Sequence, residues 1–131
     1  MLNENRLSKH IVDCAIEVHR SLGGPGLLES VYEEALAWEL VQRGLKVERQ
    51  IYVPIVYKGQ TLADPLRLDL LVERLVIIEV KATTNYNSIF ETQALTYLRL
   101  MDLQLALVIN FGEKYAKDGI HRVVNSRGKS S

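Results

Sequence analysis

The chain has 131 residues, of which 47% are hydrophobic and 24% charged, a composition typical of a globular protein with one core. Lysine plus arginine equals aspartate plus glutamate at 16 each, which excludes a surface built as a whole to coat nucleic acid or an anionic membrane. No apolar run is long enough to span a bilayer, and the first residues lack the layout of a secretory signal. We therefore expect a cytoplasmic protein with a single domain over residues 1–125 and a flexible tail over 126–131.

Two helices and an edge strand are predicted for the first half of the chain. Apolar residues recur at three- and four-residue spacing over residues 6–22 and again over 28–43, where Gly44 provides a left-handed stop. β-branched and aromatic residues over 47–57 predict a strand near a sheet edge, although Pro54 interrupts it.

The first helix carries the only cysteine, Cys14, on its apolar stripe. A single cysteine excludes an internal disulfide and a cysteine-cluster metal site. Its position on the apolar stripe predicts a buried, inert thiol rather than a nucleophile.

The second half predicts a hairpin and a strand–helix–strand unit. Residues 66–72 and 75–82 are two apolar-rich runs separated by only two residues, the spacing of a β-hairpin. A helix over 88–101 then leads to a continuous apolar run over 104–111, which predicts a strand buried on both faces and parallel to the second hairpin strand. A last short strand is expected over 120–124.

The predicted helix over 88–101 has two local signals. Ser88 and Glu91 have the spacing of a capping box, in which each side chain bonds a free backbone amide at the helix start. Gln93 and Tyr97 stand four residues apart and so share a face. By itself, this pair indicates only an amphipathic helix.

The alternation of side chains determines the register of the predicted hairpin. With the turn centred on Arg74, paired positions sum to 148 and every even residue faces an even one. A register slipped by one residue would bury half of the charges. The even residues are all apolar and are expected to share one face: Leu66, Leu68, Leu70, Val72, Val76, Ile78, Val80 and Ala82.

In this register the charged residues of the odd face converge, with Asp69 opposite Glu79 and Arg67 opposite Lys81. Two carboxylates about 4 Å apart repel by roughly 4 kcal/mol at an effective dielectric constant of 20. Either an ion-pair network with Arg67 and Lys81 neutralises them, or they bind a hard divalent cation together with the carbonyl oxygen of Val80.

Glu29 adds a third carboxylate, because it shares a helical stripe with Tyr32, Leu36 and Leu40. That stripe predicts that Glu29 points toward the sheet, where a carboxylate needs a partner. The alternative is that Glu29 is an ordinary first-turn acid, favoured there by the helix dipole.

Together these residues resemble the PD-(D/E)XK nuclease superfamily, whose core is an acid on one strand and an acid-x-Lys run on the next. Here the acid is Asp69 and the run is Glu79-Val80-Lys81. Glu29 before the sheet and the pair Gln93 and Tyr97 after it resemble the exonuclease branch of that superfamily.

A longer run, Gly26-Leu27-Leu28-Glu29-Ser30-Val31-Tyr32, is similar to the signature of the small GxxExxY proteins. Two positions depart from the superfamily pattern: Leu68 replaces a proline before Asp69, and Phe90 stands near a helix start where relatives often have a polar residue.

The resemblance implies an α/β fold with a restriction-endonuclease-like core, in which a mixed central β-sheet is flanked by α-helices. It implies that Asp69, Glu79 and the Val80 carbonyl bind Mg²⁺ or Mn²⁺, and that Glu29 supports the metal. The chemistry implied is metal-dependent hydrolysis of phosphodiester bonds in DNA.

The resemblance also implies a catalytic role for Lys81 with Asp69 and Glu79, in which Lys81 orients the attacking water or stabilises charge on the phosphate. Gln93 and Tyr97 would place the DNA backbone or Lys81. Two other functions stay open: a nucleic-acid-binding or assembly module that is inactive without a partner, and a homo-oligomerisation domain whose charged cluster is structural. We also expect a homodimer, since paired sites suit duplex DNA.

Overall fold

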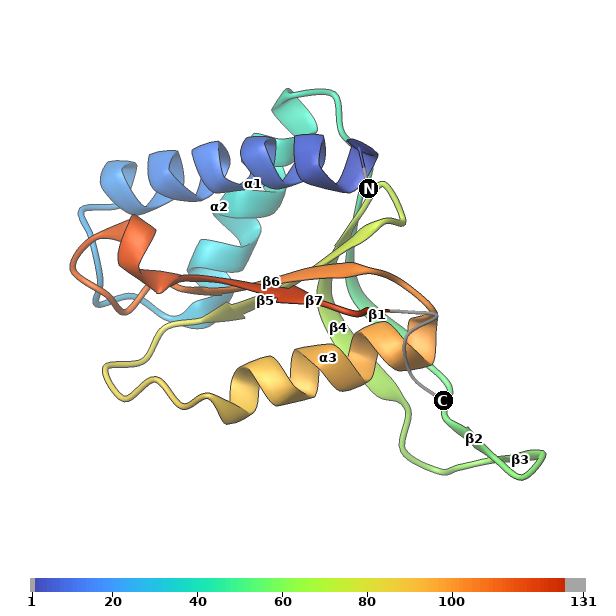
Figure 1. Ribbon diagram of the computed structural model, residues 1–131. Helices are drawn as coiled ribbons and strands as arrows, with labels where there is room; N and C mark the ends of the chain where they lie inside the picture. Colours follow the sequence, from blue (N-terminus) through green and yellow to red (C-terminus); the bar gives the residue numbers. More distant parts are fainter. Residues whose placement is uncertain (1, 127–131) are drawn as a thin grey trace.

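The computed structural model describes residues 2–126, which form a five-stranded mixed sheet between two helical layers (Figure 1). Helices α1 (Leu2–Ser21) and α2 (Glu29–Gln42) cover one face, and α3 (Ile89–Met101) covers the other. Of the tail predicted over 126–131, residues 127–131 lie outside the described residues. In spatial order the strands are β1 (Val47–Val53), β4 (Leu66–Val72), β5 (Val76–Lys81), β6 (Leu105–Asn110) and β7 (Ile120–Val124).

Strand pairing confirms the predicted strand–helix–strand unit. Strands β5 and β6 pair in parallel through the α3 crossover, whereas the other neighbours in the sheet are antiparallel. Every residue of β6 is buried, as its unbroken apolar run predicted. A short 3₁₀ helix, η1 (Ala116–Gly119), leads into β7. None of the described helices is both long and apolar enough to cross a membrane.

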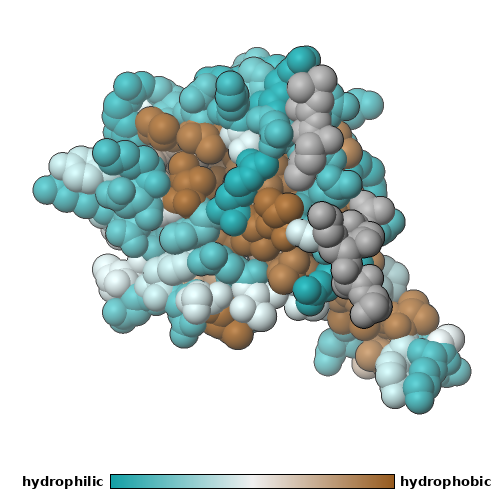
Figure 2. Space-filling view, viewed as in Figure 1, coloured by the Kyte–Doolittle hydropathy of each residue, from teal (hydrophilic) through white to brown (hydrophobic). Residues whose placement is uncertain are grey.

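The edge strand is shorter than predicted. Strand β1 lies at the sheet edge as expected, but it ends at Val53 because Pro54 follows and cannot donate a ladder hydrogen bond. The rest of the predicted strand enters a separate hairpin of β2 (Val56–Tyr57) and β3 (Gln60–Thr61), which projects from the body of the molecule (Figure 1). Figure 2 shows hydrophobic surface on this projecting segment.

Two hydrophobic cores lie on the two faces of the sheet. The larger core packs α1 and α2 against the sheet and includes Cys14, which is fully buried as predicted. Burial raises the pKa of the Cys14 thiol, which keeps it in the unreactive neutral form. The smaller core packs α3 against the other face, through Leu71 and Ile77 of the hairpin.

The predicted hairpin register is confirmed. Its strand pairs are Val72 with Val76, Leu71 with Ile77, and Leu70 with Ile78, all of which sum to 148. The turn residues Glu73 and Arg74 are both left-handed, with φ of 52° and 55°.

The predicted single apolar face, however, is wrong for Leu66 and Leu68. Leu70 and Val72 pack against α1 and α2, whereas Leu66 and Leu68 belong to the core under α3. The alternation breaks at Asp69, where the ladder between β1 and β4 is also interrupted. The two ends of β4 therefore face opposite layers, with Asp69 between them.

The predicted capping box at the start of α3 is also wrong. Ser88 makes no side-chain cap bond, and the amide of Ile89 donates instead to the Asn87 side chain at 2.9 Å. The Glu91 carboxylate accepts a hydrogen bond from the Tyr86 hydroxyl at 3.0 Å. Residues of the loop before α3 thus take the place of the predicted capping box.

Candidate metal centre

The centre forms where strands β4 and β5 separate. Backbone pairing ends at Leu70 and Ile78, and beyond it the two acidic side chains bridge the strands. The amide N–H of Asp69 donates to Glu79 Oε2 at 3.1 Å, and the amide N–H of Val80 donates to Asp69 Oδ2 at 2.8 Å. Asp69 and Glu79 therefore meet between the strands, as the register argument predicted.

Electrostatics make this pair of acids costly to ionise. Glu79 is only 7% exposed, and its burial together with the nearby Asp69 raises its pKa to about 8. Burial, more than any other cause, also raises the pKa of Asp69. Within the described residues, no lysine or arginine forms an ion pair with either carboxylate. The ion-pair network with Arg67 and Lys81 is therefore not formed.

The oxygen atoms in the gap fit a hard divalent cation. The N–H of Val80 points toward Asp69, and in an extended strand the carbonyl of the same residue points to the same side. The next carbonyl, that of Lys81, points the other way and accepts from the Phe111 amide at 2.7 Å. Two carboxylates and a backbone carbonyl are oxygen donors of the kind that Mg²⁺ binds.

The expectation that Glu29 is turned away from water is wrong. Tyr32, Leu36 and Leu40 of its stripe are fully buried, but residues 25–31 are all exposed. Glu29 begins α2, and although it is exposed, its charge contributes to the raised pKa of Asp69. No three acidic, histidine or cysteine side chains of the described chain are grouped to hold a metal ion, so Glu29 does not converge with the other two.

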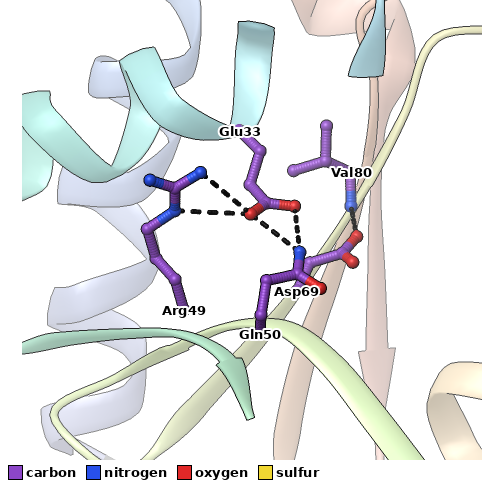
Figure 3. Close-up of polar contacts among 5 residues, drawn as sticks. All are labelled: Glu33, Arg49, Gln50, Asp69 and Val80. Atoms are coloured by element: carbon purple, nitrogen blue, oxygen red, sulfur yellow. Dashed lines mark hydrogen bonds and ion pairs between the residues drawn. The ribbon is translucent and has the colours of Figure 1, made fainter. Parts of the chain in front are cut away.

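Sequence reasoning missed Glu33, one turn further along α2 and only 6% exposed. Its carboxylate accepts hydrogen bonds from Gln50 Nε2 at 2.7 and 2.8 Å and from the Arg49 guanidinium at 3.3 and 3.4 Å (Figure 3). Glu33 also contributes to the raised pKa of both Asp69 and Glu79. Its four-residue spacing from Glu29 was the available signal, since both lie on one side of the helix.

Lys81 rests on an aromatic side chain. Its Nζ lies 4.6 Å from the ring centroid of Phe90, and its positive charge opposes the rise in pKa of Asp69 and Glu79. The Phe90 ring meets the Tyr86 ring edge-on, and Tyr86 stacks on His121 with centroids 4.1 Å apart. The apolar residue at position 90 is therefore a support for the lysine.

The two α3 residues of the predicted site, Gln93 and Tyr97, differ in exposure. Tyr97 is half-buried, and its pKa is raised by burial and then by Glu79 and Asp69, which places it beside the acidic pair. Gln93 lies four residues earlier and is exposed. The structure thus brings Tyr97 to the centre and leaves Gln93 facing solvent.

The chain leaving Lys81 is held by a fully buried amide, Asn110. Its Oδ1 accepts from the amides of Thr83 and Gly112, both at 3.0 Å, and its Nδ2 donates to the Thr83 carbonyl at 3.0 Å. Gly112 lies so close to Thr83 that an added Cβ would stand 2.3 Å from the Thr83 oxygen. These contacts tie the end of β5 to the end of β6.

We expect Asn110→Ala to lower the free energy of unfolding by about 2–4 kcal/mol, because it removes three hydrogen bonds to half-buried backbone groups of Thr83 and Gly112. Urea unfolding measures this loss. Asn85→Ala is the matched control, since Asn85 is exposed in the same connection. Equal stabilities of the two variants would contradict the prediction.

A sequence profile of the PD-(D/E)XK nuclease superfamily matches residues 5–123, a span that includes every residue of the centre. No curated protein and no solved structure matches the chain. The match and the mixed five-stranded sheet flanked by helices confirm the expected restriction-endonuclease-like α/β fold.

Proposed function

Because the chain belongs to the PD-(D/E)XK nuclease superfamily, we propose that it is a metal-dependent nuclease that hydrolyses phosphodiester bonds in DNA. Asp69, Glu79 and the carbonyl of Val80 are its proposed ligands for Mg²⁺ or Mn²⁺. The observation that carries the proposal is a facing pair of carboxylates, of which Glu79 is buried and Asp69 half-buried, beside a lysine supported by an aromatic ring. Neither carboxylate has an ion-pair partner in the described chain.

The residues around the centre have distinct proposed roles. A bound divalent cation supplies Lewis acidity to the phosphate and lowers the pKa of an attacking water. Lys81 adds positive charge where negative charge develops on the phosphate. Tyr97 lies beside the carboxylates and positions Lys81 or the DNA backbone. Gln93, one turn earlier in α3 and exposed, contacts the DNA backbone.

The run at residues 26–32 supports a narrower proposal, membership of the GxxExxY group. Its tyrosine, Tyr32, is fully buried and stacks on Phe111 with centroids 4.7 Å apart. The Tyr32 hydroxyl donates to the Gly24 carbonyl at 2.7 Å and accepts from the Leu27 amide at 3.2 Å. Tyr32 therefore stabilises the glycine-rich turn before α2. This contact explains why the run at residues 26–32 ends in a tyrosine.

A cleavage assay tests the nuclease proposal. Purified protein is incubated with labelled linear duplex, single-stranded and branched DNA, each with Mg²⁺, with Mn²⁺ or with EDTA. We expect cleavage of at least one substrate with a divalent cation and none with EDTA. Absence of cleavage together with absence of Mn²⁺ binding in calorimetry would overturn the proposal.

The contact between the Lys81 ammonium and the Phe90 ring leads to a separate prediction. Phe90→Leu keeps an apolar side chain but removes the ring face, whose attraction for a cation is worth about 0.5–2 kcal/mol. We expect the rate of DNA cleavage to fall a few-fold to about tenfold, with unchanged Mn²⁺ affinity, and Phe90→Tyr to restore the rate.

Tyr57→Leu is the matched control, because Tyr57 stands under Lys58 in the projecting hairpin, with Nζ 5.3 Å from the ring centroid. Cleavage by Phe90→Leu at the wild-type rate would show that the ring does not position Lys81.

A second candidate function, an assembly module on a nuclease fold, is favoured by the outer side of α2. Trp38 and Val41 of α2 are 60% and 51% exposed, and Leu28, just before the helix, is 75% exposed. Exposed apolar surface of this kind is typical of an interaction site. We propose on this ground that the chain forms a homodimer. Sedimentation at micromolar concentration tests it, and a mass equal to one chain would exclude it.

A further inference from the structure

Gln50 occupies the position in β1 that lies directly across from Asp69. The flanking pairs are Arg49 with Leu70 and Ile51 with Leu68, so the register continues on both sides of this position. Only the pair between Gln50 and Asp69 is missing from that ladder. The edge strand is therefore opened beside the proposed cation ligand.

The backbone of Gln50 is left-handed, with φ of 50°, a conformation that costs energy for a residue other than glycine. In a regular strand, neighbouring side chains point to opposite faces. Here both Arg49 and Gln50 reach the same carboxylate, that of Glu33 (Figure 3). The left-handed residue thus turns the Gln50 carboxamide inward.

Hydrogen bonding determines which way this carboxamide faces. Both oxygens of Glu33 accept from Nε2 of Gln50, and only the NH₂ end of an amide donates to a carboxylate. The other end, Oε1, is buried and has no hydrogen-bond partner among the described residues. The register of the flanking pairs places Gln50 across from Asp69, and Figure 3 draws both side chains. A buried amide oxygen without a partner calls for an explanation such as an ion or a water.

We propose that Gln50 Oε1 is a further oxygen donor of the cation centre and that Glu33 positions it. This inference rests on the proposed function, because it assigns an additional group to the same cation. An amide oxygen is a hard donor like the carboxylates and the Val80 carbonyl. The strained backbone and the Glu33 hydrogen bonds keep the oxygen turned toward the centre before any cation arrives.

Mn²⁺ affinity, measured by calorimetry and by the loss of the free-ion electron paramagnetic resonance signal, tests the inference without an activity assay. Gln50→Gly removes the oxygen while glycine adopts the left-handed backbone without strain, so the fold is retained. Glu33→Gln replaces the carboxylate by an amide, which can donate as well as accept. The side chain at position 33 then no longer determines which end of the Gln50 carboxamide faces the centre. We expect both variants to bind Mn²⁺ about tenfold more weakly or worse, as is typical when groups around a metal are lost.

Two matched controls carry the same chemical changes at exposed positions: Gln60→Gly in the projecting hairpin and Glu34→Gln on α2. Both are expected to bind Mn²⁺ like the wild type, and circular dichroism checks that every variant is folded. Wild-type affinity in folded Gln50→Gly, with binding lost in Asp69→Asn, would overturn the Gln50 assignment alone. Absence of Mn²⁺ binding by the wild type would overturn the proposed function itself, and the assignment with it.

Discussion

Replacing either Asp69 or Glu79 by alanine is expected to abolish both DNA cleavage and measurable Mg²⁺ or Mn²⁺ binding, because each change deletes a cation ligand. Lys81→Ala is expected to behave differently. It removes a positive charge that repels the cation, so metal affinity persists or increases. Cleavage then falls by roughly a hundredfold or more, the usual effect of losing one electrostatic contact to the transition state. Calorimetry and single-turnover cleavage measure the two effects separately.

The alanine variants also remove acceptors for backbone amides, since Asp69 accepts from Val80 and Glu79 accepts from Asp69. Asp69→Asn and Glu79→Gln keep an oxygen acceptor and remove only the charge, so they separate loss of the metal from loss of folding. Asp64→Ala and Lys58→Ala, both at exposed positions, are the matched controls. If the wild type binds no divalent metal and all site variants change only thermal stability, the cluster is structural.

The pH dependence of stability is the second large effect, and it concerns the protein in EDTA. In the unfolded chain Glu79 loses its proton near its ordinary pKa of 4.5, whereas in the folded chain burial and Asp69 raise that pKa to about 8. The folded state therefore binds more protons between these values. Its stability is fully present below about pH 4.5 and decreases as the pH rises to about 8, by roughly 1.4 kcal/mol per unit across the window.

Urea unfolding between pH 5 and 8 measures this decrease. Glu79→Gln cannot ionise, so we expect a flatter profile and a variant more stable than the wild type at pH 8, although it has lost metal affinity. Glu34→Gln, an exposed position on α2, is the control and should follow the wild type. Adding Mg²⁺ or Mn²⁺ should raise the stability of the wild-type protein at pH 8, because a ligand that binds only the folded state stabilises it. Identical pH profiles of stability for Glu79→Gln and the wild type would contradict the raised pKa of Glu79 in the folded state.

Much of the fold and the central pair of acids could be predicted from the sequence, because both depend on short repeats along the chain. The helical period located the buried faces of α1 and α2, including Cys14. The two-residue period of the hairpin determined its register, since a slip of one residue would bury charges. That register alone placed Asp69 opposite Glu79.

The surroundings of that pair were decided by tertiary structure. Periodicity identifies the inward stripe of α2 but not where the helix leaves the packed layer, so Glu29 was predicted inward and Glu33 was missed. The two ends of β4 pack in opposite cores, and the facing strand has a left-handed residue at Gln50, a conformation that no local signal predicts for a glutamine. A repeat along the chain specifies a face, whereas the partner that a buried polar group finds depends on which distant element packs against that face.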